Sequence, residues 1–340
     1  MNARVAAVLV VLLAVLGGGA LLYQQQERAR RPDNVATLGR ALFKDLKAAD
    51  IAAIRIVEPK ETLTVRRKDE RWVIVERGDF PADLAKVREF VLKVIGLKVG
   101  QSEPLGEKDR ARLGLDASGS RVEFLNAEDK SLGALSVGRK YFKREVENAD
   151  KAIPDGRWVA LPAEPGTAFL VGDPLTQATV KTAEWIDHSS FQVEKVKALQ
   201  VRYPDGEGWR IERAADNAEW RLDGAKPGEK LDVSRANAAS YSLQLLEIAD
   251  VAPKDAPDTG LDKPVSIDAT TLDGASYAIK VGKLAGENYY VSFTASGVKP
   301  DAKGAEQVKL LSPHVLLIPK SKLEDTLKKR SELLERKDQK

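Results

Sequence analysis

The sequence predicts an α+β fold, a tandem duplicated unit of mostly antiparallel strands with one covering helix per unit, preceded by a single transmembrane helix. Three observations predict this class: strand and helix patterns recur in the same order, the strands are segregated from the helices, and the chain opens with an apolar run at Val5. Strands segregated from a lone helix are typical of α+β folds, in which the helix covers one face of an antiparallel sheet.

The apolar run VAAVLVVLLAVLGGGALLY occupies Val5–Tyr23, after a short tail of residues 1–4, and it carries no charge. A helix of this length is roughly 28 Å long at about 1.5 Å per residue, close to the thickness of a hydrocarbon core. We therefore expect an uncleaved signal-anchor helix, followed by a polar tether over residues 24–36. A cleaved signal peptide is the alternative, because Gly18 and Ala20 form a small-x-small site. Basic residues flank both ends of the run, so charge alone does not determine its orientation.

Two stretches carry the same series of markers. GLDASGSRVEFLNAEDKSLGALSVGRK (residues 114–140) and GLDKPVSIDATTLDGASYAIKVGK (residues 260–283) both lead from a Gly-Leu-Asp turn to a Val-Gly pair and a basic residue. Their starts differ by 146 positions (260 − 114), and Trp72 and Trp220 differ by 148 (220 − 72). Because markers of different chemistry keep a nearly constant spacing, we expect a duplicated unit of about 145 residues, with Trp72 and Trp220 at equivalent, mostly buried positions.

Each unit has the patterns of one sheet and one covering helix. AIRIV, LTVRRK and RWVIVER alternate apolar and polar side chains, the period of half-buried strands. A helix is expected after Pro81, with one apolar stripe formed by Leu84, Val87, Val91, Val94 and Ile95. Its counterpart has Asp232 and Ser234 as candidate N-caps and carries Ala238, Tyr241, Leu245 and Ile248. We assign the first α+β repeat domain to residues 37–180, the second to 181–319, and a basic C-terminal helix to 320–340.

The composition excludes several classes of protein. The 54 basic and 51 acidic side chains give a formal net charge of +3, too even for a nucleic-acid-binding face. With no Cys and only two His, the chain has no thiolate metal site, thiol nucleophile or disulfide, and imidazole sites are poorly supplied. We therefore assign no catalytic, cofactor-binding or metal-binding residue and expect no cofactor.

Both histidines lie in sequence contexts that could suggest chemistry. Asp187-His188-Ser189 has the residue types of a catalytic triad. Adjacent residues do not ordinarily form a linear relay, so we interpret this stretch as a polar linker. His314, in SPHVLLIP, has no second His or Cys at metal-ligand spacing and is expected to be a structural histidine.

Ser296 and Lys299 have the Ser-x-x-Lys spacing of some acyl transferases. In those enzymes the pair lies on a helix, whereas Gly297 and Pro300 predict a loop here. Coincidence is therefore the simpler interpretation.

Three aromatic residues occupy late strands of the two units: Trp158, Tyr289 and Tyr290. They could stack against sugars or a partner, but we expect core or cross-strand packing. The basic tail from Lys320 has two interpretations: a solvated helix that closes the second domain, which we favour, or a surface for a partner or anionic lipid headgroups.

The doubled motifs resemble the family known as domain of unknown function 4340. Its members look like this chain, with a membrane helix, a W-x-V/L hairpin, an A-D-x-x-x-V helix, a G-L-D turn and a strand ending in V-G. In the first copy these motifs are Trp72-Val73, Ala82-Asp83 with Val87, Gly114–Asp116 and Val137-Gly138. In the second copy they are Trp220, Asp232, Gly260–Asp262 and Val281-Gly282, with Leu231 in place of the Ala. Trp185–Asp187 resembles the joint between the units.

The resemblance implies an outward-facing, single-pass accessory component of ABC-type export or gliding-motility transport systems, and it carries over no catalytic residue. We therefore expect a non-enzymatic accessory or scaffold protein, anchored in the inner (cytoplasmic) membrane by one N-terminal helix, with its bulk in the periplasm. Its expected partners are permease and ATPase subunits of a transport assembly, with no nucleic acid.

Two alternatives stay open, a membrane-tethered hydrolase of envelope polymers and a periplasmic ligand-binding module. A cleft with convergent ionisable groups would favour an enzyme, and exposed apolar patches would favour a scaffold.

Overall fold

The structure, a computed structural model, describes residues 37–149, 151–188, 192–300 and 304–335. The predicted signal anchor Val5–Tyr23 and the tether lie outside the described residues, so both stay predictions. Within these four ranges, no helix is long and apolar enough to cross a membrane. The described backbone forms two mostly antiparallel sheets with a few helices, which confirms the α+β class.

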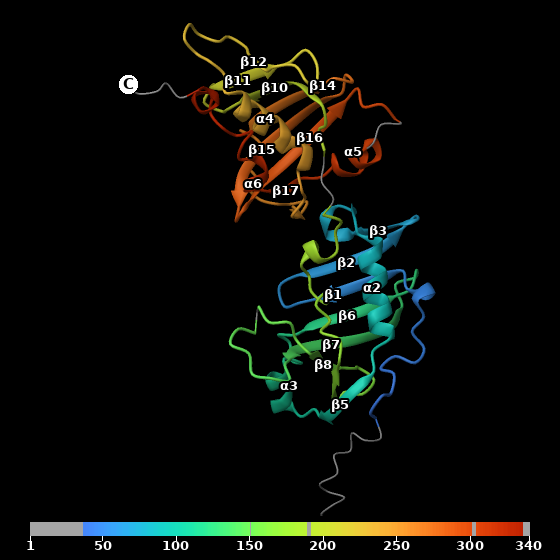
Figure 1. The fold of residues 1–340 in the computed structure, drawn as a ribbon. Helices are drawn as coiled ribbons and strands as arrows, with labels where there is room; N and C mark the ends of the chain where they lie inside the picture. Colours follow the sequence, from blue (N-terminus) through green and yellow to red (C-terminus); the bar gives the residue numbers. More distant parts are fainter. Residues whose placement is uncertain (1–36, 150, 189–191, 301–303, 336–340) are drawn as a thin grey trace, which may run out of the picture. The chain divides into compact units, whose positions relative to one another are not determined.

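The first sheet is built from nine strands. They are β1 (Ala53–Val57), β2 (Thr62–Lys68), β3 (Arg71–Ile74), β4 (Phe80–Pro81), β5 (Val99–Pro104), β6 (Ser120–Leu125), β7 (Ser131–Tyr141), β8 (Gly156–Ala160) and β9 (Thr167–Val171). Their spatial order is β4-β3-β2-β1-β6-β7-β8-β9-β5 (Figure 1). The accompanying helices are α2 (Leu84–Ile95) and α3 (Glu107–Leu113), with short 3-10 turns η2 (Ala48–Asp50), η3 (Val75–Arg77) and η4 (Thr182–Glu184).

The second sheet is built from eight strands. They are β10 (Val196–Arg202), β11 (Gly208–Glu212), β12 (Arg221–Leu222), β13 (Asp250–Val251), β14 (Val265–Thr271), β15 (Ser276–Ala285), β16 (Asn288–Ser296) and β17 (Leu316–Pro319). Their order is β12-β11-β10-β14-β15-β16-β17-β13. The helices are α4 (Val233–Tyr241), η5 (Ser242–Leu245), α5 (Ala305–Leu311), α6 (Lys320–Leu323) and η6 (Arg330–Leu333).

The two sheets have the same strand order, which is what the predicted duplication requires. Without its extra edge strand β4, the first sheet becomes β3-β2-β1-β6-β7-β8-β9-β5, and the second sheet repeats this order strand for strand. The register is also irregular at the same place, after Val137 in β7 and after Val281 in β15. One helix, α2 or α4, follows the first strands of each copy in the chain (Figure 1).

The strands of the first sheet lie within residues 53–171 and those of the second within residues 196–319. The two compact units of the described chain do not coincide with the two sheets. Residues 51–90 and 124–130, which contain strands of the first sheet, belong to the same compact unit as residues 179–335. The domain boundaries at residues 180 and 181 therefore stay a prediction.

The repeated Gly-Leu-Asp and Val-Gly motifs pack against each other in both copies. Gly114 and Gly260 have φ values of 63° and 71°, the left-handed region that favours glycine. A Cβ on Gly138 or Gly282 would lie 2.2 or 2.1 Å from the carbonyl oxygen of the residue that precedes the turn glycine. Only glycine fits such a close backbone approach, so the two motifs recur together as one packing unit.

The C-terminal segment, residues 320–335, corrects one prediction, because it forms no continuous helix. It contains the four-residue α6 and η6, with Leu323 and Leu333 fully buried. The Tyr203 hydroxyl donates to the Leu327 carbonyl and the Trp209 indole N–H donates to the Lys328 carbonyl, both at 2.7 Å. Side chains of the second sheet therefore bind carbonyls that a continuous helix would have used internally.

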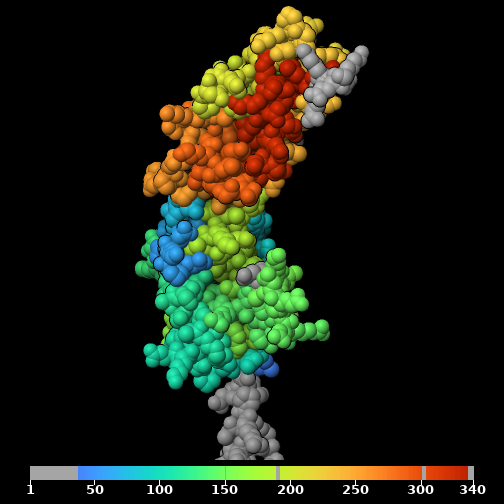
Figure 2. Space-filling model, turned by 90° about the vertical axis from the view of Figure 1, so that its left-hand side faces the viewer, coloured from blue at the N-terminus to red at the C-terminus, as the bar shows by residue number. Residues whose placement is uncertain are grey.

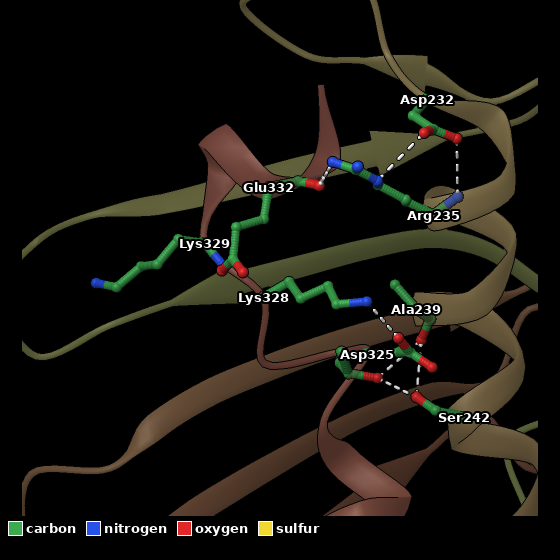
Figure 3. Close-up of polar contacts among 9 residues, drawn as sticks. Asp232, Arg235, Ala239, Ser242, Asp325, Lys328, Lys329 and Glu332 are labelled. Carbon is green, nitrogen blue, oxygen red and sulfur yellow. Dashed lines mark hydrogen bonds and ion pairs between the residues drawn. The ribbon is translucent and has the colours of Figure 1, made fainter. Parts of the chain in front are cut away.

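The C-terminal segment also packs along α4 (Figure 3). The Thr326 hydroxyl donates to the Ala239 carbonyl at 2.8 Å, and Lys328 binds Asp325 at 2.6 Å. Arg235 of α4 donates to the carbonyls of Glu332 and Leu334. The segment, red in Figure 2, therefore packs against the second sheet and α4 in an irregular conformation.

The ionisation of Tyr203 provides a measure of the packing of the C-terminal segment, because its hydroxyl binds the Leu327 carbonyl. Burial raises the pKa of Tyr203 to about 12, against about 10 for an ordinary tyrosine. Because the folded state holds this proton more tightly, the stabilisation is complete below about pH 10 and is lost as the pH rises through about 12. Burial also raises the pKa of Tyr277, so we expect absorbance at 295 nm to show late-titrating phenols, one of which Tyr203→Phe removes. A native protein whose tyrosines all titrate near pH 10 would refute this.

Candidate functional site

The two covering helices begin in the same way. An Asp Oδ1 caps each N-terminus: Asp83 accepts from the amides two and three residues later at 2.8 and 3.4 Å, and Asp232 at 3.0 and 3.2 Å. This capping satisfies backbone donors that a helix leaves unpaired at its start. Of the two candidate N-caps, Asp232 is confirmed, whereas Ser234 lies inside α4. Asp83 and Asp232 define equivalent positions along the two helices.

The inner face of each helix is buried against its own sheet. On α2 the buried residues are Val87, Phe90, Val91 and Val94. On α4 they are Ala236, Ala239 and Ser240, followed by Leu243 of η5. Each helix therefore covers its sheet as expected, but the buried face is not the whole predicted stripe, because Leu84, Tyr241 and Leu245 are exposed.

The outer faces carry large apolar side chains at the same distances from the capping Asp. Leu84 and Leu92 lie one and nine residues after Asp83, as Val233 and Tyr241 do after Asp232, and Leu245 of η5 continues the second series. All five side chains are between 45 and 58 % exposed. We call these two series the outer stripes: Leu84 and Leu92 on α2, and Val233, Tyr241 and Leu245 on α4–η5.

The residues between the stripe positions differ in charge. Arg88 lies between Leu84 and Leu92 on α2. On α4 the same position holds Asn237, whose Oδ1 accepts a hydrogen bond from Trp220 Nε1 at 2.9 Å. Single exposed apolar residues are ordinary, but aligned ones at matching positions on two helices are typical of an interaction surface.

The structure places the predicted polar linker residues apart from any relay. His188 Nδ1 lies 2.7 Å from the Ile248 carbonyl and Nε2 lies 2.8 Å from the Ala183 carbonyl. Both imidazole nitrogens are therefore engaged by backbone, and Ser189 lies outside the described residues. His314 is half-buried, and this burial lowers its pKa.

The Ser-x-x-Lys pair lies in a loop, as predicted. Ser296 ends β16, and Gly297 follows with φ of 70°, so the pair does not share a helix. Lys299 lines a groove of about 280 Å³ in the second sheet, together with Glu194 and Asp273. A hydrogen bond from the Thr271 hydroxyl is the main cause that lowers the pKa of Asp273.

The aromatic candidates have structural positions. Trp158 belongs to a buried cluster with Leu113, Leu115 and Leu170, which is the predicted core packing. Tyr289 and Tyr290 are half-buried on β16. In the part of the chain that the structure describes, no group of three or more His, Asp or Glu side chains is placed to hold a metal ion.

Sequence reasoning did not find the outer stripes. The helical pattern assigned Leu84, Tyr241 and Leu245 to the stripes that cover the sheets, which is wrong, because all three side chains are more than half exposed. It assigned Leu92 and Val233 to no surface. The equal distances from Asp83 and Asp232 were the available signal. Another missed group is Asp250 on β13, a half-buried carboxyl whose pKa is raised by burial.

Comparison with known proteins adds one finding. Residues 72–264 match the family described as domain of unknown function (DUF4340), a region that includes α2, α4 and the joint between the two copies. No curated protein and no solved structure gives a significant match.

Proposed function

The chain belongs to the domain of unknown function (DUF4340) family, and from this membership and the outer stripes we propose that it is a non-enzymatic scaffold protein. In this proposal the protein is a membrane-anchored accessory of an ABC-type export assembly, tethered through Val5–Tyr23 with its body in the periplasm. It acts through protein–protein contacts of its two sheets. The export setting rests on the family resemblance.

The repetition of exposed apolar residues carries the proposal. Leu84 and Leu92 on α2 match Val233 and Tyr241 on α4, at equal distances from a capping Asp. Burial of an exposed apolar residue against a partner favours binding by about 25 cal/mol per Å² of apolar area removed from water.

The chemistry of the stripes indicates the kind of partner. The α4–η5 stripe contains Val233, Asn237, Tyr241 and Leu245 without a formal charge, and Tyr is among the residues enriched at binding hot spots. Apolar residues at i, i+8 and i+12, with an uncharged Asn at i+4, suit an apolar groove or helix of the partner. We propose the extracytoplasmic part of a permease subunit as that partner.

Charged substitutions in the stripes test the proposal. Leu92→Glu and Leu245→Glu are expected to keep the melting temperature of the wild type, because exposed substitutions usually change stability by less than about 0.5 kcal/mol. Recovery of the permease by crosslinking in cells is expected to fall about tenfold or more, and complementation of a deletion strain is expected to fail. The matched control is Ile153→Glu, at a site 89 % exposed in the connection between β7 and β8.

Full complementation by both stripe variants would refute the docking role of the stripes. The same assay addresses the enzymatic alternative through Ser296→Ala and Lys299→Ala, which alter exposed side chains of the loop. Both are expected to complement, because a scaffold does not concentrate its function in one polar group. A folded, abundant Lys299→Ala protein that behaves like the deletion would favour catalysis instead.

A further inference from the structure

A groove of about 520 Å³ lies on the first sheet, separate from the outer stripes. It is formed by the segment 40–46, the start of β7 at residues 131–134, the loop 161–164 and Arg121 of β6. All these residues belong to the same compact part of the chain. The volume is within the range of about 300–1,000 Å³ that is typical of small-molecule sites.

The floor of this groove is apolar. Leu42, Leu46 and Leu161 are buried beneath it, and Phe43 is half-buried. Leu132 on β7 is 36 % exposed at its edge. A lining of this kind favours a hydrocarbon chain over a sugar or a peptide backbone, because it offers few hydrogen-bonding groups along the floor.

The rim of the groove carries charges of both signs. Arg40, Lys44 and Arg121 line it together with Asp45 and Glu164, and Glu123 is the ion-pair partner of Arg121. Arg40 binds Glu164 at 2.9 and 3.1 Å and therefore forms part of the wall. Lys44 is exposed, and Arg121 pairs with Glu123 in a partly exposed ion pair, a kind that contributes little. These two cations can therefore contact an anionic headgroup.

The position of the groove in the chain indicates the source of such a ligand. Only 13 residues (36 − 23) separate the end of the predicted anchor from Thr37, the first described residue. Fully extended, this tether reaches at most about 47 Å. If Val5–Tyr23 is the anchor, Thr37 therefore lies within about 47 Å of the membrane surface, and a groove that begins at Arg40 can reach the lipid headgroups.

We propose that this groove binds an acyl chain of an anionic membrane phospholipid, with Lys44 and Arg121 at the headgroup. The proposal rests on the membrane anchoring in the proposed function. It adds a lipid-binding site that neither the anchor nor the outer stripes require.

The test uses the full chain in phosphatidylcholine nanodiscs that contain phosphatidylglycerol with a photoreactive group in its acyl chain. After illumination, labelled peptides are identified by mass spectrometry. We expect labelling of residues 41–46 or 131–134 in addition to Val5–Tyr23. Leu132→Glu and Lys44→Glu are each expected to reduce groove labelling about fivefold or more and to leave anchor labelling unchanged. Leu284→Glu, at an exposed position of β15, is the matched control.

The outcomes separate this inference from the anchoring on which it rests. Anchor labelling without groove labelling would overturn the lipid site and support the anchor. Groove labelling without labelling of Val5–Tyr23 would support the site and refute the anchor. Equal groove labelling by a photoreactive phosphatidylcholine would overturn the role of Lys44 and Arg121 in selecting an anionic headgroup.

Discussion

Replacing Trp220 by Ala is expected to lower the free energy of unfolding of the second sheet by about 3–5 kcal/mol. The indole is buried, its Nε1 donates to Asn237 at 2.9 Å, and the Arg213 guanidinium lies 4.7 Å from the ring centroid. Removing the ring leaves a cavity beneath α4, and it takes the stacking partner from a buried Arg213. Urea denaturation followed by tryptophan fluorescence and circular dichroism measures the loss.

Trp72 is the matched comparison, because the strand registers place it at the position equivalent to Trp220. Val73, which follows Trp72, pairs with Arg66 of β2. Arg221, which follows Trp220, pairs with Glu212 at the corresponding position of β11. Trp72 is only half-buried, which corrects the expectation that both tryptophans are mostly buried. Trp72→Ala is therefore expected to cost less, about 1–2 kcal/mol. Equal losses at the two positions would contradict this difference in burial.

Replacing Gly138 by Ala is expected to destabilise the first sheet by about 3 kcal/mol. The added Cβ would lie 2.2 Å from the Leu113 carbonyl oxygen and 3.0 Å from the Leu115 side chain. The closest neighbour is backbone, so the turn itself would have to move. Gly282→Ala in the second copy is expected to behave in the same way, with its Cβ 2.1 Å from the Thr259 oxygen. Thermal and urea unfolding of both variants measure the effect.

Gly172 provides the control for this prediction. A Cβ at Gly172 meets no atom within 4 Å, and its backbone is outside the left-handed region. Gly172→Ala is therefore expected to be neutral or to stabilise the protein by up to about 1 kcal/mol through the unfolded chain. Similar losses in Gly138→Ala and Gly172→Ala would show that the close approach of turn and strand is not what makes Gly138 necessary.

Sequence reasoning was most accurate at positions where the local backbone accepts only one kind of residue. The Gly-Leu-Asp and Val-Gly motifs could be paired across the two copies because their glycines have no substitute at such close approach. Asp232 could be recognised as an N-cap because its carboxylate satisfies neighbouring amides of its own helix. Gly297 predicted the loop at Ser296 and Lys299 because glycine readily adopts the positive φ found there.

The candidate site could not be found in this way, because exposure is a property of the packed molecule. Leu92 and Val91 are adjacent apolar residues, but only Val91 faces the sheet. A helical pattern with apolar residues on more than one side does not say which side the sheet will cover. The groove around Leu42 and Leu132 likewise joins residues far apart in the chain.

The sequence by itself determined the duplication, the strand-rich class and the cap of the second covering helix, since these depend on residue spacing and on contacts within a few positions. The tertiary structure alone decided the form of the C-terminal segment and the exposure of the two tryptophans. Tyr203 and Trp209 bind the carbonyls of Leu327 and Lys328 across more than a hundred positions, and these bonds replace the helix that residues 320–335 were expected to form. A sequence pattern records the local preference of a segment, whereas such distant donors decide which conformation satisfies its backbone.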